Sequence, residues 1–208
     1  MKTNLYIDGF NLYYGALRGS PYRWLDLAQM CRLLLPAHDI HRLRYFTALV
    51  TPRPNNPSQL RDQLTYIRAI ETTSNLTVHY GQFRTHAVRM PLVNPPTRGP
   101  KTAEVWRTEE KGSDVNLATF ALRDAFAGDC EVCVLITNDS DLVEPVNIIR
   151  QELGLTVGIL NPHWRASRDL ARAATFTKRI RAGVLRSSQF PNVIQDSVGR
   201  HIRKLSGW

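Results

Sequence analysis

Apolar positions along the chain change their spacing several times, and each change marks a different kind of element. Up to residue 83 the pattern predicts, in order, a strand over 3–8, a short helix to about residue 16, a helix over 25–35, a strand over 40–50, a helix over 58–73 and a strand over 76–83. After residue 112 it predicts a helix over 113–126, a strand over 131–137, a helix over 141–153, a strand over 155–160 and a helix over 167–176. Strands separated by helices favour an α/β fold with a central, mainly parallel sheet and helices on both faces.

One long segment does not follow this alternation. Residues 84–107 contain residues that interrupt helices and strands, namely Pro91, Pro95, Pro96, Gly99 and Pro100. We therefore expect a long loop or a hairpin outside the core, and loops of this length in a compact domain are often functional. Beyond residue 176 the periodicity is weak, and neither internal repeats nor a clear linker divide the chain.

The acidic residues with the most informative positions follow the apolar runs. Asp8 ends the first predicted strand, Asp139 and Asp141 follow the strand over 131–137, and Asp114 opens the helix after residue 112. Because the carboxyl ends of parallel strands share one edge of a sheet, acids far apart in sequence can converge there. Carboxylate oxygens are the ligands that Mg²⁺ and Mn²⁺ prefer, so the pattern predicts a divalent metal site.

Each acid taken singly also fits a purely structural role. Asp114 and Asp141 suit the first turn of a helix, where a carboxylate stabilises the helix by roughly 0.3–1 kcal/mol through the helix dipole. Asp8, followed by Gly9, suits the turn after a strand. As a set of four, however, they favour a metal site over coincidence. The neighbours expected to orient a ligand or to hydrogen-bond within the turn are Asn11, Asn138 and Ser140.

The composition is typical of one folded domain, but the net charge is strongly positive. The 208 residues can bury a proper core, and a hydrophobic fraction of 43% excludes a disordered chain. The chain carries 27 Lys and Arg against 18 Asp and Glu, which gives a formal net charge of +9. Such an excess favours a polyanionic partner, either nucleic acid or an acidic membrane surface.

The sequence gives no sign of a membrane span or a signal peptide. No run approaches the roughly 20 apolar residues that cross a bilayer, and the N-terminus lacks the apolar segment of a signal peptide. We therefore expect a cytoplasmic protein, and the odd number of three cysteines agrees with a reducing compartment. Cys130 and Cys133 have no second pair, so buried structural thiols are favoured over zinc or redox chemistry.

Basic residues gather in two segments. Residues 178–208 hold seven, including Arg179 and Arg181, against the single acid Asp196. In the irregular segment, Trp106 is available to stack on a base. The basic residues there that we expect to contact nucleic acid are Arg84, Arg89, Arg98, Lys101 and Arg107. Lys111, close to the acids, is the best single candidate for a phosphate contact. A solvated basic face without a ligand is the alternative.

Three blocks of this sequence, in this order, resemble the signatures of the NYN domain family. The blocks are Tyr6-Ile7-Asp8-Gly9-Phe10-Asn11-Leu12, Lys111-Gly112-Ser113-Asp114-Val115 and Ile136-Thr137-Asn138-Asp139-Ser140-Asp141-Leu142-Val143-Glu144-Pro145. That family is a branch of the PIN-like nucleases and is related to bacterial LabA-type proteins. The resemblance extends over roughly residues 3–180, and the segment 167–176 is similar to the family's closing helix.

The resemblance implies a fold and a division of the chain. The implied fold is Rossmann-like and of the PIN type, with three layers. The implied nuclease domain covers 1–180 with an insertion at about 84–110, and a basic extension over 181–208 packs on the same domain.

The resemblance also implies an activity. Its matching acids, Asp8, Asp114, Asp139 and Asp141, would bind Mg²⁺ or Mn²⁺ for phosphodiester hydrolysis. The expected protein is a metal-dependent endoribonuclease with RNA, or another single-stranded nucleic acid, as its partner. The preference for RNA over DNA rests on the resemblance alone. PIN-like domains often dimerise, which leaves a homodimer open.

The chain departs from the family's pattern at Phe120, where many relatives carry another Asp. This leaves the number of metal ions open, with Asn116 or Glu144 as substitute ligands. It also leaves open an RNA-binding or scaffold protein that keeps the fold but has weak or no turnover. A phosphatase of the haloacid dehalogenase type is not favoured, because it needs an Asp two residues after Asp8, where Phe10 stands.

Overall fold

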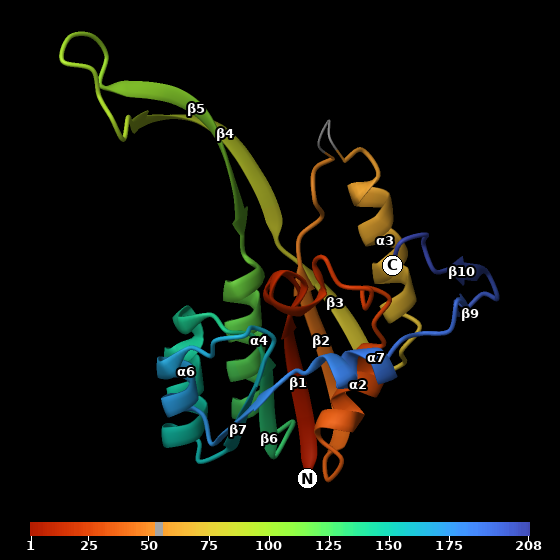
Figure 1. Cartoon of the computed structure of the whole chain (residues 1–208). Coiled ribbons are helices and arrows are strands. Elements are labelled where there is room, and N and C mark those ends of the chain that lie inside the picture. Colours follow the sequence, from red (N-terminus) through yellow and green to blue (C-terminus); the bar gives the residue numbers. More distant parts are fainter. Residues whose placement is uncertain (53–55) are drawn as a thin grey trace.

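Strands near the centre of the molecule form one parallel sheet (Figure 1). The structure, a computed structural model, describes residues 1–52 and 56–208, and within them six strands belong to this sheet. They are β1 (Lys2–Asp8), β2 (Asp39–Thr47), β3 (Leu76–Tyr80), β6 (Val132–Ile136), β7 (Thr156–Asn161) and β8 (Phe176–Arg179). Their order is β3-β2-β1-β6-β7-β8, and every neighbouring pair is parallel. The expected α/β fold with a central parallel sheet is confirmed.

Helices cover both faces of this sheet, which completes the three layers (Figure 1). On one face lie α1 (Gly9–Leu12), α2 (Leu27–Leu34), α3 (Gln59–Ile70) and α7 (Ala182–Ser187). On the other lie α4 (Ser113–Phe126), α5 (Val143–Asn147) and α6 (Arg168–Ala173). The central strand β1 sends Leu5 and Ile7 into the first of the two cores and Tyr6 into the second. This alternation is the period of two that a strand requires.

The strand order places a switch point between β1 and β6. From β1 the chain moves outward through β2 to β3, whereas from β6 it moves in the opposite direction through β7 to β8. The loops that leave the carboxyl ends of β1 and β6 therefore diverge, and α/β proteins bind ligands in the crevice that this creates. As expected, Asp8 ends β1 and Asp139 follows β6 at this point.

The irregular segment forms a hairpin that leaves the body as a long arm (Figure 1). Its strands, β4 (Gln82–Pro91) and β5 (Thr102–Lys111), pair antiparallel along their whole length. A Cβ atom added at Gly81 would lie 2.7 Å from the Lys111 carbonyl oxygen and 2.9 Å from the Ser113 nitrogen. The arm can therefore pass this close to the start of α4 only because residue 81 is a glycine.

Two helices expected from the sequence differ in the structure. The helix expected over 167–176 ends at Ala173, and Phe176–Arg179 forms the edge strand β8. That strand exposes three of its four residues, so it carries no alternation that a sequence pattern could reveal. The helix expected over 141–153 changes its winding around α5, with a 3₁₀ turn before it and a π-helical turn after it: η2 (Ser140–Leu142) and η3 (Ile148–Glu152).

The C-terminal residues lie against the face that carries α2 and α3. A small hairpin of β9 (Val193–Gln195) and β10 (His201–Arg203) follows α7. The ring of Trp208 then lies 5.9 Å from Trp24 and 6.1 Å from Tyr66, measured between ring centroids. Aromatic contacts of this kind bury large apolar areas. The basic C-terminal stretch is thus attached to the body through Trp208 and through the buried Leu185 and Ile202.

Two expectations drawn from composition can be compared with the structure. Within residues 1–52 and 56–208, no helix is long and apolar enough to cross a membrane. The three cysteines, Cys31, Cys130 and Cys133, are buried and free. The Sγ atoms of Cys130 and Cys133 lie 3.4 Å apart inside the core on the α4 face, which agrees with structural thiols.

Candidate active site

Asp8 is fixed at the carboxyl end of β1 and is only 4% exposed. Its Oδ1 accepts a hydrogen bond of 2.9 Å from the backbone N–H of Asn11, which caps α1. Its Oδ2 accepts one of 3.1 Å from the hydroxyl of Thr137, the residue that follows β6. The two strands at the switch point therefore hold this carboxylate in one orientation.

Thr137 also connects Asp8 with the second acid, Asp139. The backbone N–H of Asp139 donates to the Thr137 hydroxyl oxygen at 3.1 Å, while the same hydroxyl donates to Asp8. The Asp139 carboxylate accepts from the backbone N–H of Asp141 at 3.1 Å and thereby caps the turn η2. Thr137 was not among the site residues predicted from the sequence. Its signal was a polar residue at the end of an otherwise apolar buried run.

Asp114 comes from the first turn of α4, and the arm helps to position that turn. Gly112 precedes the helix with a φ of 99°, a left-handed conformation that favours glycine. The Glu110 carboxylate, at the end of β5, accepts 3.1 and 2.7 Å hydrogen bonds from the backbone N–H and the hydroxyl of Ser113. Glu110 was also missed, because the sequence analysis placed it with the arm and not with the acids.

These acids line one cavity of about 530 Å³ at the base of the arm. Three of the four predicted acids are among its lining residues, together with Asn11 and Glu110: Asp8, Asp114 and Asp139. The arm supplies one wall through Phe83, Thr85 and Thr108, and the Phe83 ring packs edge-on against Phe10 at 5.7 Å. Three separate segments of the chain thus place carboxylates around one space.

The acids raise one another's pKa values. Burial raises the pKa of Asp8, and the nearby charge of Asp139 raises it further, although the hydrogen bonds from Asn11 and Thr137 act in the opposite direction. Burial, which has the largest effect, and the charges of Asp8, Asp139, Glu110 and Asp141 together raise the pKa of Asp114 to about 6. The cavity therefore favours protons or a cation over ionised, unpaired carboxylates.

The raised pKa of Asp114 predicts that the effect of Asp114→Asn on the Tm in EDTA depends on pH. Because the folded state raises the pKa of Asp114 from 3.8 to about 6, ionisation destabilises the fold progressively as the pH rises from about 4 to about 6. Asn cannot ionise, so the variant should have a higher Tm than wild type at pH 7.5 and a smaller advantage at pH 4.5. Thermal unfolding at both pH values measures this. An advantage that is equal at both would contradict the prediction.

Two of the three predicted asparagines, Asn11 and Asn138, hold the loops around the cavity together. Asn11 Oδ1 accepts from the backbone N–H of Asn138 at 3.0 Å and lies 2.9 Å from His163 Nε2. Asn138 in turn accepts from the backbone N–H of Ser167 at 2.6 Å and donates to the Arg165 carbonyl at 3.1 Å. The loops after β1, β6 and β7 are therefore linked. His163 is a further residue that sequence reasoning did not bring to the site.

Other predicted residues lie outside the cavity lining. Asp141, Ser140 and Glu144 are exposed on and after the turn η2, with Asp141 near enough for its charge to raise the pKa of Asp114. Asn116 donates to the Tyr80 carbonyl at 3.4 Å and so joins α4 to β3. Asp141 remains at the rim of the site, whereas Asn116 serves the packing of a helix.

Trp106 lies on the face of the arm that continues the cavity wall. Strand register pairs Thr85 with Thr108 in that wall, and the next pair on the same face is Ala87 with Trp106. The Trp106 ring is 77% exposed and lies opposite the smallest side chain on that face. Antiparallel strands rise about 3.4 Å per residue, which places Trp106 roughly 14 Å from Glu110 along the arm. The arm thus presents an exposed aromatic ring on the face that leads to the acids, roughly 14 Å beyond Glu110.

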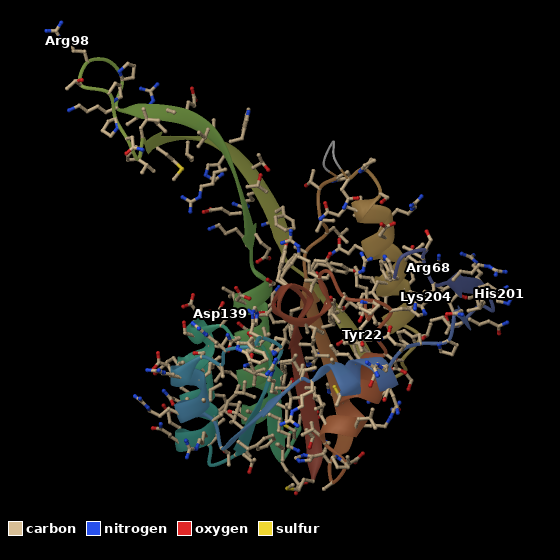
Figure 2. The ribbon with its side chains drawn as sticks, viewed as in Figure 1. Tyr22, Arg68, Arg98, Asp139, His201 and Lys204 are labelled. Carbon is tan, nitrogen blue, oxygen red and sulfur yellow. The ribbon has the colours of Figure 1, made fainter. Side chains whose placement is uncertain are left out.

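The predicted basic residues divide between the arm and the opposite side of the sheet. Arg89 shares the Trp106 face, whereas Lys111 lies on the other face with its Nζ 3.0 Å from Glu109. Arg84 and Arg107 lie on the same face of the arm as Lys111. Arg98 and Lys101 lie in the connection between β4 and β5. Arg98 is at the tip of the arm, far from Asp139 (Figure 2). At the other end of the sheet the Arg179 guanidinium lies 4.0 Å from the Trp164 ring, and Arg181 is exposed just before α7. Lys111, expected as a direct phosphate contact, faces away from the cavity.

Phe120, the departure from the family's pattern, is not part of the cavity lining. Its ring centroid lies 4.2 Å from that of His79, and the guanidinium carbons of Arg44 and Arg123 lie 4.9 and 4.4 Å from the ring centre. Six residues of helix separate it from Asp114, a rise of about 9 Å. Its replacement of an acid therefore changes the packing of α4 and leaves the carboxylates of the cavity in place.

The donor set of the cavity fits a hard divalent cation. Its charged groups are carboxylates, the ligands that Mg²⁺ and Mn²⁺ prefer. In the part of the chain that the structure describes, however, no three His, Cys, Asp or Glu side chains approach closely enough to hold one ion among them. The chemistry of the site fits a metal, while its carboxylates are spread around the cavity.

Comparisons with known proteins identify the family and support the fold. The chain is 30% identical over 223 residues to a Pseudomonas putida strain S16 protein named 6-hydroxy-3-succinoylpyridine 3-monooxygenase HspA, with 93% of this chain and 72% of that protein covered. Its fold is similar to the crystal structure of a Vibrio parahaemolyticus protein of unknown function, with a TM-score of 0.54 and 17% identity over 87% of this chain and 93% of the other. The model of the NYN domain matches residues 2–181. The chain therefore belongs to the NYN domain family, a branch of the PIN-like nuclease superfamily.

Proposed function

We propose that the protein is a metal-dependent endoribonuclease that hydrolyses RNA with Mg²⁺ or Mn²⁺. The observation that carries this proposal is the meeting of Asp8, Asp114 and Asp139, from three separate segments, in one cavity at the switch point of the sheet. Because Mg²⁺ keeps several waters and binds through one or two carboxylates, an ion here would take one or two of these three acids as direct ligands and reach the others through water, with Asp141 at the rim. Membership of a nuclease family supports the reaction class.

The proposed reaction requires carboxylates that are already oriented and that gain from binding a cation. A divalent ion, when bound, supplies charge stabilisation for the phosphoryl oxygens and an activated water. Asp8 enters the site already oriented by Asn11 and Thr137, so little side-chain freedom is lost on binding. The raised pKa of Asp114 reflects repulsion among the carboxylates, which a cation relieves.

The arm is the proposed guide for the nucleic acid. Residues 82–111 contain six Lys and Arg against three Asp and Glu, a net charge of +3 with His neutral. The exposed Trp106 lies on the face that leads to the cavity, and bases stack on such rings without sequence preference. This arrangement supports a single-stranded substrate, because bases in a duplex are not free to stack on protein side chains.

We predict that Trp106→Ala weakens the binding of single-stranded RNA by roughly 5-fold to 150-fold, since stacking contributes about 1–3 kcal/mol per base. The matched control is Val105→Ala, which truncates the neighbouring residue on the opposite face of β5. Fluorescence anisotropy with a labelled oligonucleotide in EDTA measures binding without cleavage. Equal affinities for wild type and Trp106→Ala would remove the arm from the binding surface.

The proposed activity is tested with a mixed pool of labelled RNA and single-stranded DNA, incubated with Mn²⁺, Mg²⁺ or EDTA. We expect cleavage products from RNA with either ion and none in EDTA. Cleavage of DNA alone, or of both polymers at equal rates, would replace the RNA specificity that the proposal includes. RNA that is bound but not cut with either ion would favour the alternative of a binding or scaffold protein.

The name of the Pseudomonas putida relative suggests a different reaction class for that protein. At 30% identity the name does not fix the chemistry of this chain. Incubation of this protein with 6-hydroxy-3-succinoylpyridine, a reductant and air distinguishes the two classes. We expect the pyridine to be recovered unchanged, and formation of a hydroxylated product would contradict the nuclease proposal.

A further inference from the structure

A second, smaller cavity lies directly beside the acid cavity. Its volume is about 140 Å³, and we call it the aromatic pocket after the side chains in its wall: Phe10, Tyr13, Tyr14, Tyr45, Tyr66 and Trp208. They come from the N-terminal helical turns, β2, α3 and the C-terminal residue. Phe10, Tyr14 and Gln59 also line the acid cavity, so the two spaces share a wall. A ligand in one is therefore next to a ligand in the other.

The volume of the aromatic pocket suits one small ring. A protein cavity of roughly 150 Å³ lined by apolar side chains holds a benzene-sized molecule. At about 140 Å³ the aromatic pocket has the volume of one six-membered ring. Aromatic walls favour a flat, electron-poor ring by offset or edge-on packing. The shape and lining thus point to a single planar heterocycle.

Arg23 gives the pocket a polar group in need of a partner. It lines the pocket, and its Nε is buried and has no hydrogen-bond partner among the described residues. Its guanidinium also donates to the Gly207 carbonyl and lies 5.8 Å from the centre of the Trp208 ring, so it contacts the C-terminal residues that close one side of the pocket. A buried donor left unpaired is costly, which favours a ligand that brings an acceptor such as a ring carbonyl.

Gln59 provides a second polar contact at the boundary of the two cavities. It is the first residue of α3 and lines both spaces. Its amide offers a donor and an acceptor side by side, the pattern that reads the edge of a base. The pocket therefore combines flat apolar walls with groups suited to a carbonyl- and N–H-bearing ring.

We propose that the aromatic pocket binds one six-membered heteroaromatic ring, the base of a pyrimidine nucleotide whose phosphate lies in the acid cavity. This proposal rests on the proposed nuclease function, because that function supplies the nucleotide. The shared wall of Phe10, Tyr14 and Gln59 connects the two parts of such a ligand. The consequence is that cleavage is directed to a site beside a pyrimidine.

The test is isothermal titration calorimetry with four probes in Mg²⁺: uridine 5′-monophosphate, adenosine 5′-monophosphate, ribose 5-phosphate and nicotinate. None contains a phosphodiester bond, so binding is measured without cleavage and a failure of nuclease activity leaves this test intact. We expect the uridine nucleotide to bind at least about 10-fold more tightly than the other three probes. Ribose 5-phosphate binding as tightly as the uridine nucleotide would overturn the proposal.

Two variants locate the binding of the uridine nucleotide. Tyr13→Ala removes a partly exposed wall of the pocket and should weaken binding by roughly 5-fold or more, as expected for the loss of a stacking ring. Arg23→Gln should also weaken it. The matched controls are Phe126→Ala, an exposed ring at the far end of α4, and Arg32→Gln on the surface of α2, and both should bind as wild type does.

Two results would contradict the assignment. Unchanged affinity in both Tyr13→Ala and Arg23→Gln would place the nucleotide outside the aromatic pocket. Nicotinate that binds more tightly than the uridine nucleotide, with a loss in Arg23→Gln, would assign the pocket to free heteroaromatic acids and not to a base of the substrate.

Discussion

Asp8→Asn should reduce the rate of RNA cleavage by about 10³-fold or more while the protein remains folded. A divalent ion supplies several kcal/mol of transition-state stabilisation, and a loss of about 4 kcal/mol corresponds to a factor of roughly 10³. Asp8 is the most buried acid of the cavity and is held by Asn11 and Thr137, so no neighbour can take its place. The measurement is single-turnover cleavage of a labelled RNA at saturating protein.

The fold of this variant provides an internal check. Because burial raises the pKa of Asp8, its ionised form destabilises the apo protein at neutral pH, and Asn removes that charge. The Tm of Asp8→Asn in EDTA should therefore equal or exceed that of wild type. The matched control is Asp39→Asn, an exposed acid at the start of β2 on the opposite edge of the sheet. Wild-type cleavage by Asp8→Asn, or an equal loss in Asp39→Asn, would contradict the assigned role.

Asp124→Ala should be the most destabilising of the substitutions considered, at about 3–5 kcal/mol, since it leaves a buried partner charge without compensation. Asp124 in α4 accepts hydrogen bonds of 2.7 and 3.2 Å from the buried Arg44 of β2. It also accepts one of 3.1 Å from the Tyr6 hydroxyl in β1. These contacts fasten α4, and with it Asp114, to the sheet. Urea unfolding measures the loss.

A double substitution separates the buried charge from a simple packing defect. Arg44→Met with Asp124→Leu removes both charges and should recover a large part of the lost stability, because replacing a buried ion pair with apolar residues is often neutral. Asp169→Ala, an exposed acid in the first turn of α6, is the surface control and should cost less than about 1 kcal/mol. A double variant as unstable as Asp124→Ala would show that the charge of Arg44 is not the cause.

Parts of the site could be predicted because local patterns determine them. Asp8 and Asp139 end apolar runs, and the rule that parallel strands share a carboxyl edge places them together without knowledge of any contact. Asp114 follows Gly112, whose left-handed φ of 99° marks the start of α4. In each case a short sequence both forms the element and positions the acid.

Other parts depend on register and tertiary contacts that a sequence does not display. Glu110 reaches the cavity only because β5 pairs with β4 in a register that turns its side chain toward Ser113, whereas Lys111 consequently turns away. Thr137 matters through two hydrogen bonds across the gap between β1 and β6. Three of the four residues of β8 are exposed, and the strand is held by its pairing with β7. Its own sequence therefore fits the end of a helix as well as it fits a strand.

The most direct test of the proposed metal-dependent cleavage is its dependence on Mn²⁺ concentration, measured for wild type and Asp139→Asn with a labelled single-stranded RNA. Asp139 lies in the cavity beside Asp8, and loss of one carboxylate should weaken cation binding without removing the others. We predict saturable activation of wild type and a midpoint shifted at least about 10-fold higher in Asp139→Asn. Cleavage that persists in EDTA, or the same midpoint in both proteins, would contradict a cation held by these acids.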